Sequence, residues 1–209
     1  MTATGFRDYR EQDARAVRAS VEVVSAVTAA DLGRPTPCAE WTLGDLLAHM
    51  TVQHSGFTAA AAGRGADPDV WKAGAPATDP VTEYAMAAEL VIAAFAEPGV
   101  LDRGFSLPEI IPGVEFPAAQ AISFHFIDYV VHGWDVARAL GVPYALDADL
   151  VQAALPVAEA VPGGERRLRP GAAFRPRLSE PAGAGAGPDG MDRILALLGR
   201  SPAWSPPAI

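Results

Sequence analysis

The sequence predicts an all-α protein, an up-down four-helix bundle with a small irregular extension at its C-terminal end. Three observations predict this class. Half of the 209 residues are hydrophobic, which is enough for a sizeable core. Four long segments place apolar residues at helical intervals, and connectors rich in glycine and proline separate them. We expect residues 1–163 to form the bundle and residues 164–209 to form an extension packed on it.

The first two helices have clear ends. Apolar residues recur at helical spacing through residues 6–31, and Gly33 and Pro35 stop this first helix. The second helix begins after Thr42, because Thr42 and Asp45 have the spacing of a capping box, and it extends to about Ala62.

The middle of the chain is predicted to contain a loop, a helix and a short irregular segment. Residues 63–78 are rich in Gly, Ala, Asp and Pro and should form a loop. The third helix covers about residues 79–97. Its expected buried residues are Tyr84, Leu90, Val91 and Phe95. Residues 100–116 contain several prolines among apolar residues, which favours an irregular or hairpin segment.

The C-terminal half begins with the fourth long helix, residues 117–140, for which Pro117 is a normal first-turn residue. We expect a fifth helix over residues 148–160, after acidic residues that suit a helix N-terminus. Residues 165–190 should be a loop, with two short strands considered around Pro170-Gly171. A short amphipathic helix over residues 191–198 follows.

Composition narrows the classes of function. The formal net charge of −9 and the lack of a basic patch argue against nucleic acid as a partner. Cys38 is the only cysteine, so no intramolecular disulfide can form. No stretch reaches about 18 uninterrupted apolar residues, and the N-terminus is charged where a signal peptide is apolar. We therefore expect a soluble cytoplasmic protein without a membrane partner, and we consider a homodimer.

The most informative stretch is residues 124–135 in the fourth helix. His125, Asp128, His132 and Asp135 lie three, four and three residues apart, so they share one stripe of the helix. Their neighbours are apolar residues that belong in a core. Burying unpaired charges costs several kcal/mol or more, so this stripe requires a partner, and a metal ion is the leading candidate.

A third ligand is expected from the second helix, where His49 lies in an apolar setting. Helical bundles build metal sites from an i,i+4 pair, here Asp128 and His132, and a ligand on a facing helix. Two imidazoles and one carboxylate with open positions form a catalytic pattern, whereas a structural zinc site usually has four protein ligands. Zinc, nickel and iron are all compatible with these ligands.

The other polar residues have alternative interpretations. The histidines of the stripe could be core residues hydrogen-bonded to Asp128 and Asp135. In the metal interpretation, His125 and Asp135 are pocket residues that orient the ligands, or Asp135 pairs with Arg138. His54 is expected at the surface or at the pocket rim.

Cys38 precedes the second helix, where a thiolate could be stabilised. We favour a small buried apolar role over a nucleophilic one, because no histidine flanks it.

Two blocks of the sequence resemble a known family. Residues 35–49, Pro-Thr-Pro-Cys-Ala-Glu-Trp-Thr-Leu-Gly-Asp-Leu-Leu-Ala-His, and residues 128–139, Asp-Tyr-Val-Val-His-Gly-Trp-Asp-Val-Ala-Arg-Ala, resemble the DinB/YfiT-like helical bundles. They are more closely similar to the metal-binding domain of mycothiol-dependent maleylpyruvate isomerases, and residues 191–202 resemble the ending of one subgroup. The resemblance implies that His49, Asp128 and His132 are metal ligands. Asp128 departs from the isomerase, which has Glu there.

The resemblance also implies a chemistry, in which a divalent metal binds a low-molecular-weight thiol as thiolate and the thiolate adds to an electrophilic substrate. The prediction is therefore a metal-binding, mycothiol-dependent transferase or isomerase acting on a small molecule, with zinc the most expected ion. Three alternatives remain open: a hydrolase that uses metal-bound water, a non-catalytic binding or stress protein, and a dimerising bundle with a purely structural polar stripe.

Overall fold

The computed structural model describes residues 5–38, 41–74, 78–168, 172–179 and 190–206. It is mostly helical, as the sequence predicted. The helices are α1 (Arg10–Val24), α2 (Leu43–Ala61), α3 (Pro80–Ala96), α4 (Ala118–Leu140), α5 (Ala148–Ala160) and α6 (Gly190–Leu197). Short 3₁₀ turns cover Ala29–Asp31, Pro68–Trp71, Val100–Asp102 and Glu165–Leu168. Strands β1 (Gly104–Ser106) and β2 (Glu115–Pro117) form the small hairpin between α3 and α4.

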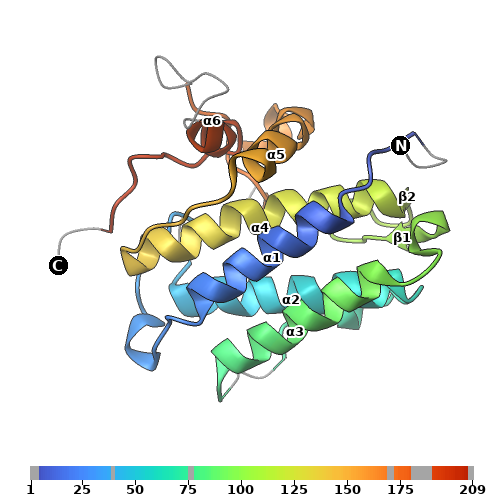
Figure 1. The fold of residues 1–209 in the computed structure, drawn as a ribbon, viewed down its shortest axis with the longest axis horizontal. Helices are drawn as coiled ribbons and strands as arrows, with labels where there is room; N and C mark the ends of the chain where they lie inside the picture. The colour runs from blue at the N-terminus through green and yellow to red at the C-terminus, as the bar shows by residue number, and fades with distance from the viewer. Residues whose placement is uncertain (1–4, 39–40, 75–77, 169–171, 180–189, 207–209) are drawn as a thin grey trace.

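Helices α1 to α4 form the bundle, and the core lies between them (Figure 1). The most extensive contacts join α1 to α4 and α2 to α3, and α1 also packs on α3. Helix α2 in turn contacts α4, so the pair that carries the predicted metal ligands is in direct contact. Helices α5 and α6 lie on the other side of α4 from α2 and α3 (Figure 1) and pack on each other. The predicted division at residue 163 remains a prediction.

Helix α2 starts where the sequence predicted, because the capping box forms. The Thr42 hydroxyl accepts a hydrogen bond from the Asp45 backbone N–H, and the Asp45 carboxylate accepts one from the Thr42 backbone N–H. By contrast, the prediction of one helix over residues 6–31 is wrong at its C-terminal end. Helix α1 ends at Val24, and a second capping box between Thr28 and Asp31 starts a separate 3₁₀ turn.

The third helix confirms three of its four expected buried residues. Tyr84, Val91 and Phe95 are fully or almost fully buried, but Leu90 is 60% exposed. Residues 84, 88, 91 and 95 form one helical stripe, whereas residue 90 is six positions after residue 84 and points to the opposite side. The hairpin expected within residues 100–116 is confirmed by antiparallel pairing of Phe105 with Phe116.

Helix α4 is the most buried element of the bundle and carries the polar stripe inward. Gly133 allows the connector after α4 to pack closely, since a Cβ atom there would lie 2.3 Å from the Tyr144 hydroxyl oxygen. The strands considered around Pro170-Gly171 fall outside the described residues.

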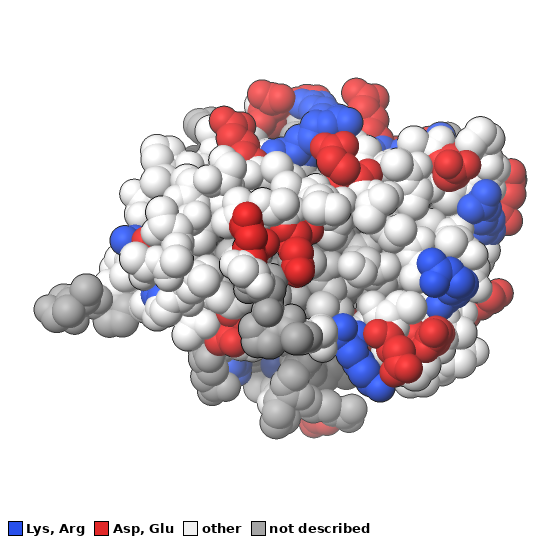
Figure 2. Space-filling view, turned by 90° about the horizontal axis from the view of Figure 1, so that it is seen from below, with Lys and Arg blue, Asp and Glu red and all other residues white. Residues whose placement is uncertain are grey.

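The surface fits an acidic protein. On the face shown in Figure 2, acidic and basic side chains are interspersed rather than gathered into one basic surface. Among the described residues, no helix combines the length and the apolar character that crossing a membrane requires.

Candidate metal centre

The structure brings His49, Asp128 and His132 together between α2 and α4. One ligand atom from each residue lies within 4.8 Å of the other two. His132 Nε2 is 3.4 Å from Asp128 Oδ1, and the imidazole rings of His49 and His132 meet edge-on with centroids 5.4 Å apart. The two α4 ligands are one helical turn apart, so the backbone of a single helix fixes their spacing.

His132 is oriented by Asp135. Its Nδ1 donates to Asp135 Oδ2 over 2.9 Å, and both side chains are buried. An ionised carboxylate can only accept, so the imidazole proton belongs on Nδ1 and the Nε2 lone pair faces Asp128. Two acceptors that approach to 3.4 Å are stabilised by a cation between them. Such carboxylate–histidine pairs are the usual support of a metal-bound imidazole, so the arrangement fits a metal ion.

His49 is kept neutral by its surroundings. Burial, together with the nearby His132, lowers the pKa of His49 to about 4, and the Trp41 ring packs against the imidazole with centroids 4.7 Å apart. A neutral imidazole has a lone pair available at physiological pH, which is the form that binds metals.

The side chain of Asp128, the carboxylate of this group, is 21% exposed. It stands where the resemblance expects Glu.

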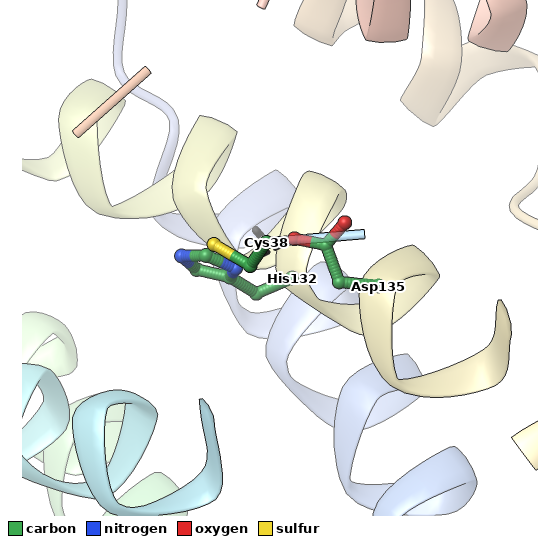
Figure 3. Close-up of side chains that lie close together, drawn as sticks. All are labelled: Cys38, His132 and Asp135. Atoms are coloured by element: carbon green, nitrogen blue, oxygen red, sulfur yellow. Dashed lines mark hydrogen bonds and ion pairs between the residues drawn. The ribbon is translucent and has the colours of Figure 1, made fainter. Parts of the chain in front are cut away.

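Cys38, His132 and Asp135 form a second group of possible ligands and lie close together (Figure 3). Asp135 contacts His132 through Nδ1, whereas Asp128 faces Nε2. Arg200 already occupies this place. Its Nη2 donates to Asp135 Oδ2 and to Cys38 Sγ, both over 3.1 Å. A guanidinium carries a permanent positive charge, so it excludes a second cation here. The first group is therefore the better candidate for a metal site.

Charge and burial set the protonation of this second group. Burial raises the pKa of Asp135, but the charge of Arg200 and the hydrogen bonds from His132 and Arg200 outweigh it and leave the pKa below its usual value. Burial raises the pKa of the Cys38 thiol to about 12, although Arg200 opposes this. Cys38 is therefore a neutral thiol. It is half-buried rather than fully buried, and it accepts a hydrogen bond from Arg200.

A cleft of about 510 Å³ opens beside His49. Helix α2 forms one wall, and Trp41 and Trp71 contribute aromatic surface. Gln53 donates to Glu109 Oε2 over 2.6 Å at its edge. A small molecule in this cleft would contact the imidazole of His49 directly.

The other two histidines form a separate buried cluster. His125 Nδ1 donates to Asp13 Oδ1 over 2.6 Å, and His125 Nε2 is hydrogen-bonded to His54 Nδ1 over 3.0 Å. All three residues are at most 1% exposed. The expectation of His54 at the surface or the pocket rim is therefore wrong: its ring stacks on Tyr129 with centroids 4.0 Å apart, inside the core.

His125 was expected to be a pocket residue that orients the metal ligands, but it belongs to this buried cluster instead. The structure places His125 against α1 and His54, while the described lining of the cleft holds His49 but not His125. Asp135 supports His132, and it pairs with Arg200 rather than with Arg138, whose guanidinium donates to the Pro202 carbonyl.

The parts of two residues in these networks, Asp13 and Arg200, were not predicted from the sequence. The burial of Asp13 could have been predicted, because it is four residues before Val17 on the apolar stripe of the first helix. The part of Arg200 could not, since nothing in the sequence near residue 200 indicates a contact with residue 135.

The fold and the site together define a class of protein, a helical bundle with a two-histidine, one-carboxylate group between two of its helices. Residues 14–137 match the model of the mycothiol maleylpyruvate isomerase N-terminal domain. The chain belongs to this family, which is part of the DinB/YfiT-like superfamily.

Two curated relatives, both from Mycobacterium tuberculosis and from two different strains, are described as uncharacterized proteins. Each is 31% identical over 199 residues, which cover 90% of this chain and 94% of the relative. No solved structure matches the chain significantly.

Proposed function

We propose that the protein binds a divalent metal ion through His49, Asp128 and His132 and acts as a mycothiol-dependent transferase or isomerase on a small-molecule substrate. The observation that carries the proposal is the convergence of three acceptor atoms within 4.8 Å beside an open cleft. Membership of the mycothiol maleylpyruvate isomerase N-terminal domain family supports the choice of thiol.

In this proposal, each residue of the site has a separate role. Asp135 fixes His132 so that Nε2 points at the shared centre, and burial keeps His49 neutral. Two histidines and one carboxylate leave coordination positions open, as in catalytic rather than structural sites. A divalent ion bound there lowers the pKa of a bound thiol or water. Trp41 and Trp71 provide apolar surface for the substrate in the cleft.

The metal part of the proposal is tested by zinc titration of the metal-free protein with a competing chromogenic chelator. We expect one equivalent to bind. His132→Ala should weaken zinc binding by at least about 100-fold, because losing a ligand costs more than the 10- to 100-fold typical of its supporting residues.

His54→Phe is the matched control, since it removes a histidine of the same helix α2 that belongs to the other cluster. It should leave the zinc stoichiometry at one. Wild-type protein that takes up no zinc, or His132→Ala protein that binds like the wild type, contradicts the assignment.

The thiol part is tested by conjugation of mycothiol to a fluorogenic electrophile, monochlorobimane. We expect product formation above the uncatalysed rate that requires both zinc and mycothiol and disappears in His132→Ala. Turnover of substrate esters or amides without added thiol would instead indicate metal-bound water and a hydrolase. Zinc binding with neither activity would favour the non-catalytic binding or stress protein.

A further inference from the structure

Arg200 lies three residues after the end of α6, and its side chain is buried inside the molecule. It is 3% exposed. Its Nη2 and Nε point at the two oxygens of the Asp135 carboxylate, over 3.1 and 3.4 Å. This two-pronged contact fits the planar guanidinium and holds a carboxylate in one orientation.

The backbone around Arg200 is built for this contact. Helix α6 ends at Leu197, and Gly199, two residues further on, has a φ of +76°, a conformation that suits glycine. The Arg200 backbone N–H then donates to the Leu195 carbonyl over 2.8 Å. Arg167, itself 5% exposed, donates to the Leu197 carbonyl over 2.6 Å and ties the same turn to an earlier part of the chain. The position of the guanidinium is thus fixed from several directions.

The contacts form a continuous chain from the C-terminal segment to the candidate metal centre. Arg200 holds Asp135, Asp135 accepts from His132 Nδ1, and His132 Nε2 faces Asp128. Without the guanidinium, the fully buried carboxylate of Asp135 would be left with a single partner and would be free to rotate away from Nδ1. Leaving a buried charge without its partner is strongly unfavourable.

We propose that Arg200 is a positioning residue of the metal centre, which holds Asp135 so that His132 keeps its proton on Nδ1 and offers Nε2 to the metal. This inference rests on the proposed function. It adds a residue from outside the region that matches the family, since the match ends at residue 137. The C-terminal segment thereby completes a site whose ligands all come from the bundle.

Zinc affinity of Arg200→Met tests the proposal. We expect the zinc Kd to rise about 10- to 100-fold, the usual loss when the support of a metal ligand is removed. Arg200→Lys should recover part of this loss, because an ammonium pairs with Asp135 but cannot form both prongs. The double variant Arg200→Met with Asp135→Asn should have a zinc Kd no higher than that of the weaker-binding single variant, because both residues act through His132.

Arg138→Met is the matched control. Arg138 also anchors the C-terminal segment, through the Pro202 carbonyl, and no hydrogen bond or ion pair among the described residues joins it to Asp135. It should lower the melting temperature while leaving the zinc Kd within about threefold, a difference of under 1 kcal/mol. Equal zinc affinities for Arg200→Met and Arg138→Met would reduce Arg200 to a structural anchor and overturn the proposal.

The tautomer of His132 provides a second readout that does not depend on zinc. Long-range ¹⁵N–¹H spectra of metal-free protein at pH 9 should show His132 protonated on Nδ1 in the wild type and a mixture of tautomers in Arg200→Met. The same tautomer populations in both overturn the proposal, whereas absent zinc uptake by the wild type overturns the proposed function. If Arg200→Met does not fold, two other measurements test the proposal. The first is the zinc affinity of Arg200→Lys, and the second is which nitrogen of His132 binds zinc in the wild type. Zinc on Nδ1 contradicts the proposal.

Discussion

The carboxylate of Asp128 has to meet two histidine nitrogens with one methylene fewer than the glutamate that the resemblance expects. The structure shows that it comes close, since its Oδ1 lies 3.4 Å from His132 Nε2. Its side chain is also 21% exposed, so the site has room beside it. Because the Asp128 carboxylate is already close to His132 and is partly exposed, we expect the site to accept a longer carboxylate at this position.

Asp128→Glu should accordingly keep zinc binding, with a Kd within about tenfold of the wild type, a difference of about 1.4 kcal/mol. Asp128→Asn, which has the same shape without the charge, should bind zinc far more weakly. The chelator competition assay measures both. Equal losses in the two variants would show that the length of the side chain, rather than its charge, limits binding.

At the same scale, His54 should make the stability of the protein depend on pH. Burial, and next the neighbouring His125, holds the pKa of His54 well below its ordinary value. Tyr84 and Tyr129 pack against its ring, and Asp13 acts on it through His125. Below about pH 6.5 the unfolded chain binds a proton on this histidine that the folded chain does not, so stability falls as pH falls, by up to about 1.4 kcal/mol per pH unit.

His54→Phe removes this linkage and keeps an aromatic ring against Tyr129. We expect it to cost about 1–3 kcal/mol at pH 7.5, because His125 Nε2 is left without its partner. Its stability should then fall less steeply than that of the wild type between pH 6.5 and 5. Urea unfolding with a chelator present measures both slopes, and parallel slopes would contradict the linkage.

The four histidines show which residue positions can be predicted from the sequence. His49, Asp128 and His132 could be placed together because helical periodicity fixes the i,i+4 pair and an apolar setting turns His49 inward. His54 could not be placed, because its partner His125 lies 71 positions away in the chain and is brought to it only by the packing of α2 and α4. Arg200 depends on a tertiary contact in the same way.

At the scale of elements, helix α2 provides both a candidate ligand, His49, and a wall of the cleft. Gly56 is the point where this wall is assembled, because a Cβ atom there would lie 2.3 Å from the Trp71 ring. Trp71 is 7% exposed, and its indole N–H donates to the Gly65 carbonyl over 2.8 Å. The absence of a side chain at residue 56 thus lets the short Pro68–Trp71 turn close over α2.

Gly56→Ala should therefore destabilise the protein. Alanine gains up to about 1 kcal/mol of helix propensity over glycine, but overpacking against a buried ring typically costs about 1–3 kcal/mol. We expect a net loss and a shift of the tryptophan emission to longer wavelength as Trp71 leaves the wall. Ser55→Ala, on the exposed side of the same turn, is the control and should change neither. Unchanged emission in Gly56→Ala would show that the ring position does not depend on this contact.

Element boundaries were predictable where local chemistry decides them. The Thr42–Asp45 capping box fixed the start of α2, and Gly141 and Pro143 indicated the end of α4. The end of α1 was missed because a second capping box, between Thr28 and Asp31, lies within an otherwise helical apolar pattern. Leu90 was assigned to the core by its hydrophobicity, although its helical phase places it outside.

At the scale of the whole molecule, the candidate centre joins parts that are distant in the chain. Its candidate ligands come from α2 and α4, and Arg200, which pairs with Asp135, comes from the segment after α6. An ion at this centre would bind the folded chain and hardly the unfolded one. Ligands that bind only the native state raise its stability by mass action. Zinc should therefore act on the unfolding of the entire protein.

Zinc at a free concentration of 100 times its Kd should add about 2.7 kcal/mol to the free energy of unfolding. For a chain of this size, about 2–4 °C of melting temperature corresponds to each kcal/mol, so we expect a rise of about 5–11 °C. Differential scanning fluorimetry with buffered zinc measures it. The rise should vanish in His132→Ala and with magnesium, which prefers oxygen ligands. An equal rise in His132→Ala would mean that zinc stabilises the protein from another place, because that variant lacks the nitrogen on which the proposed centre depends.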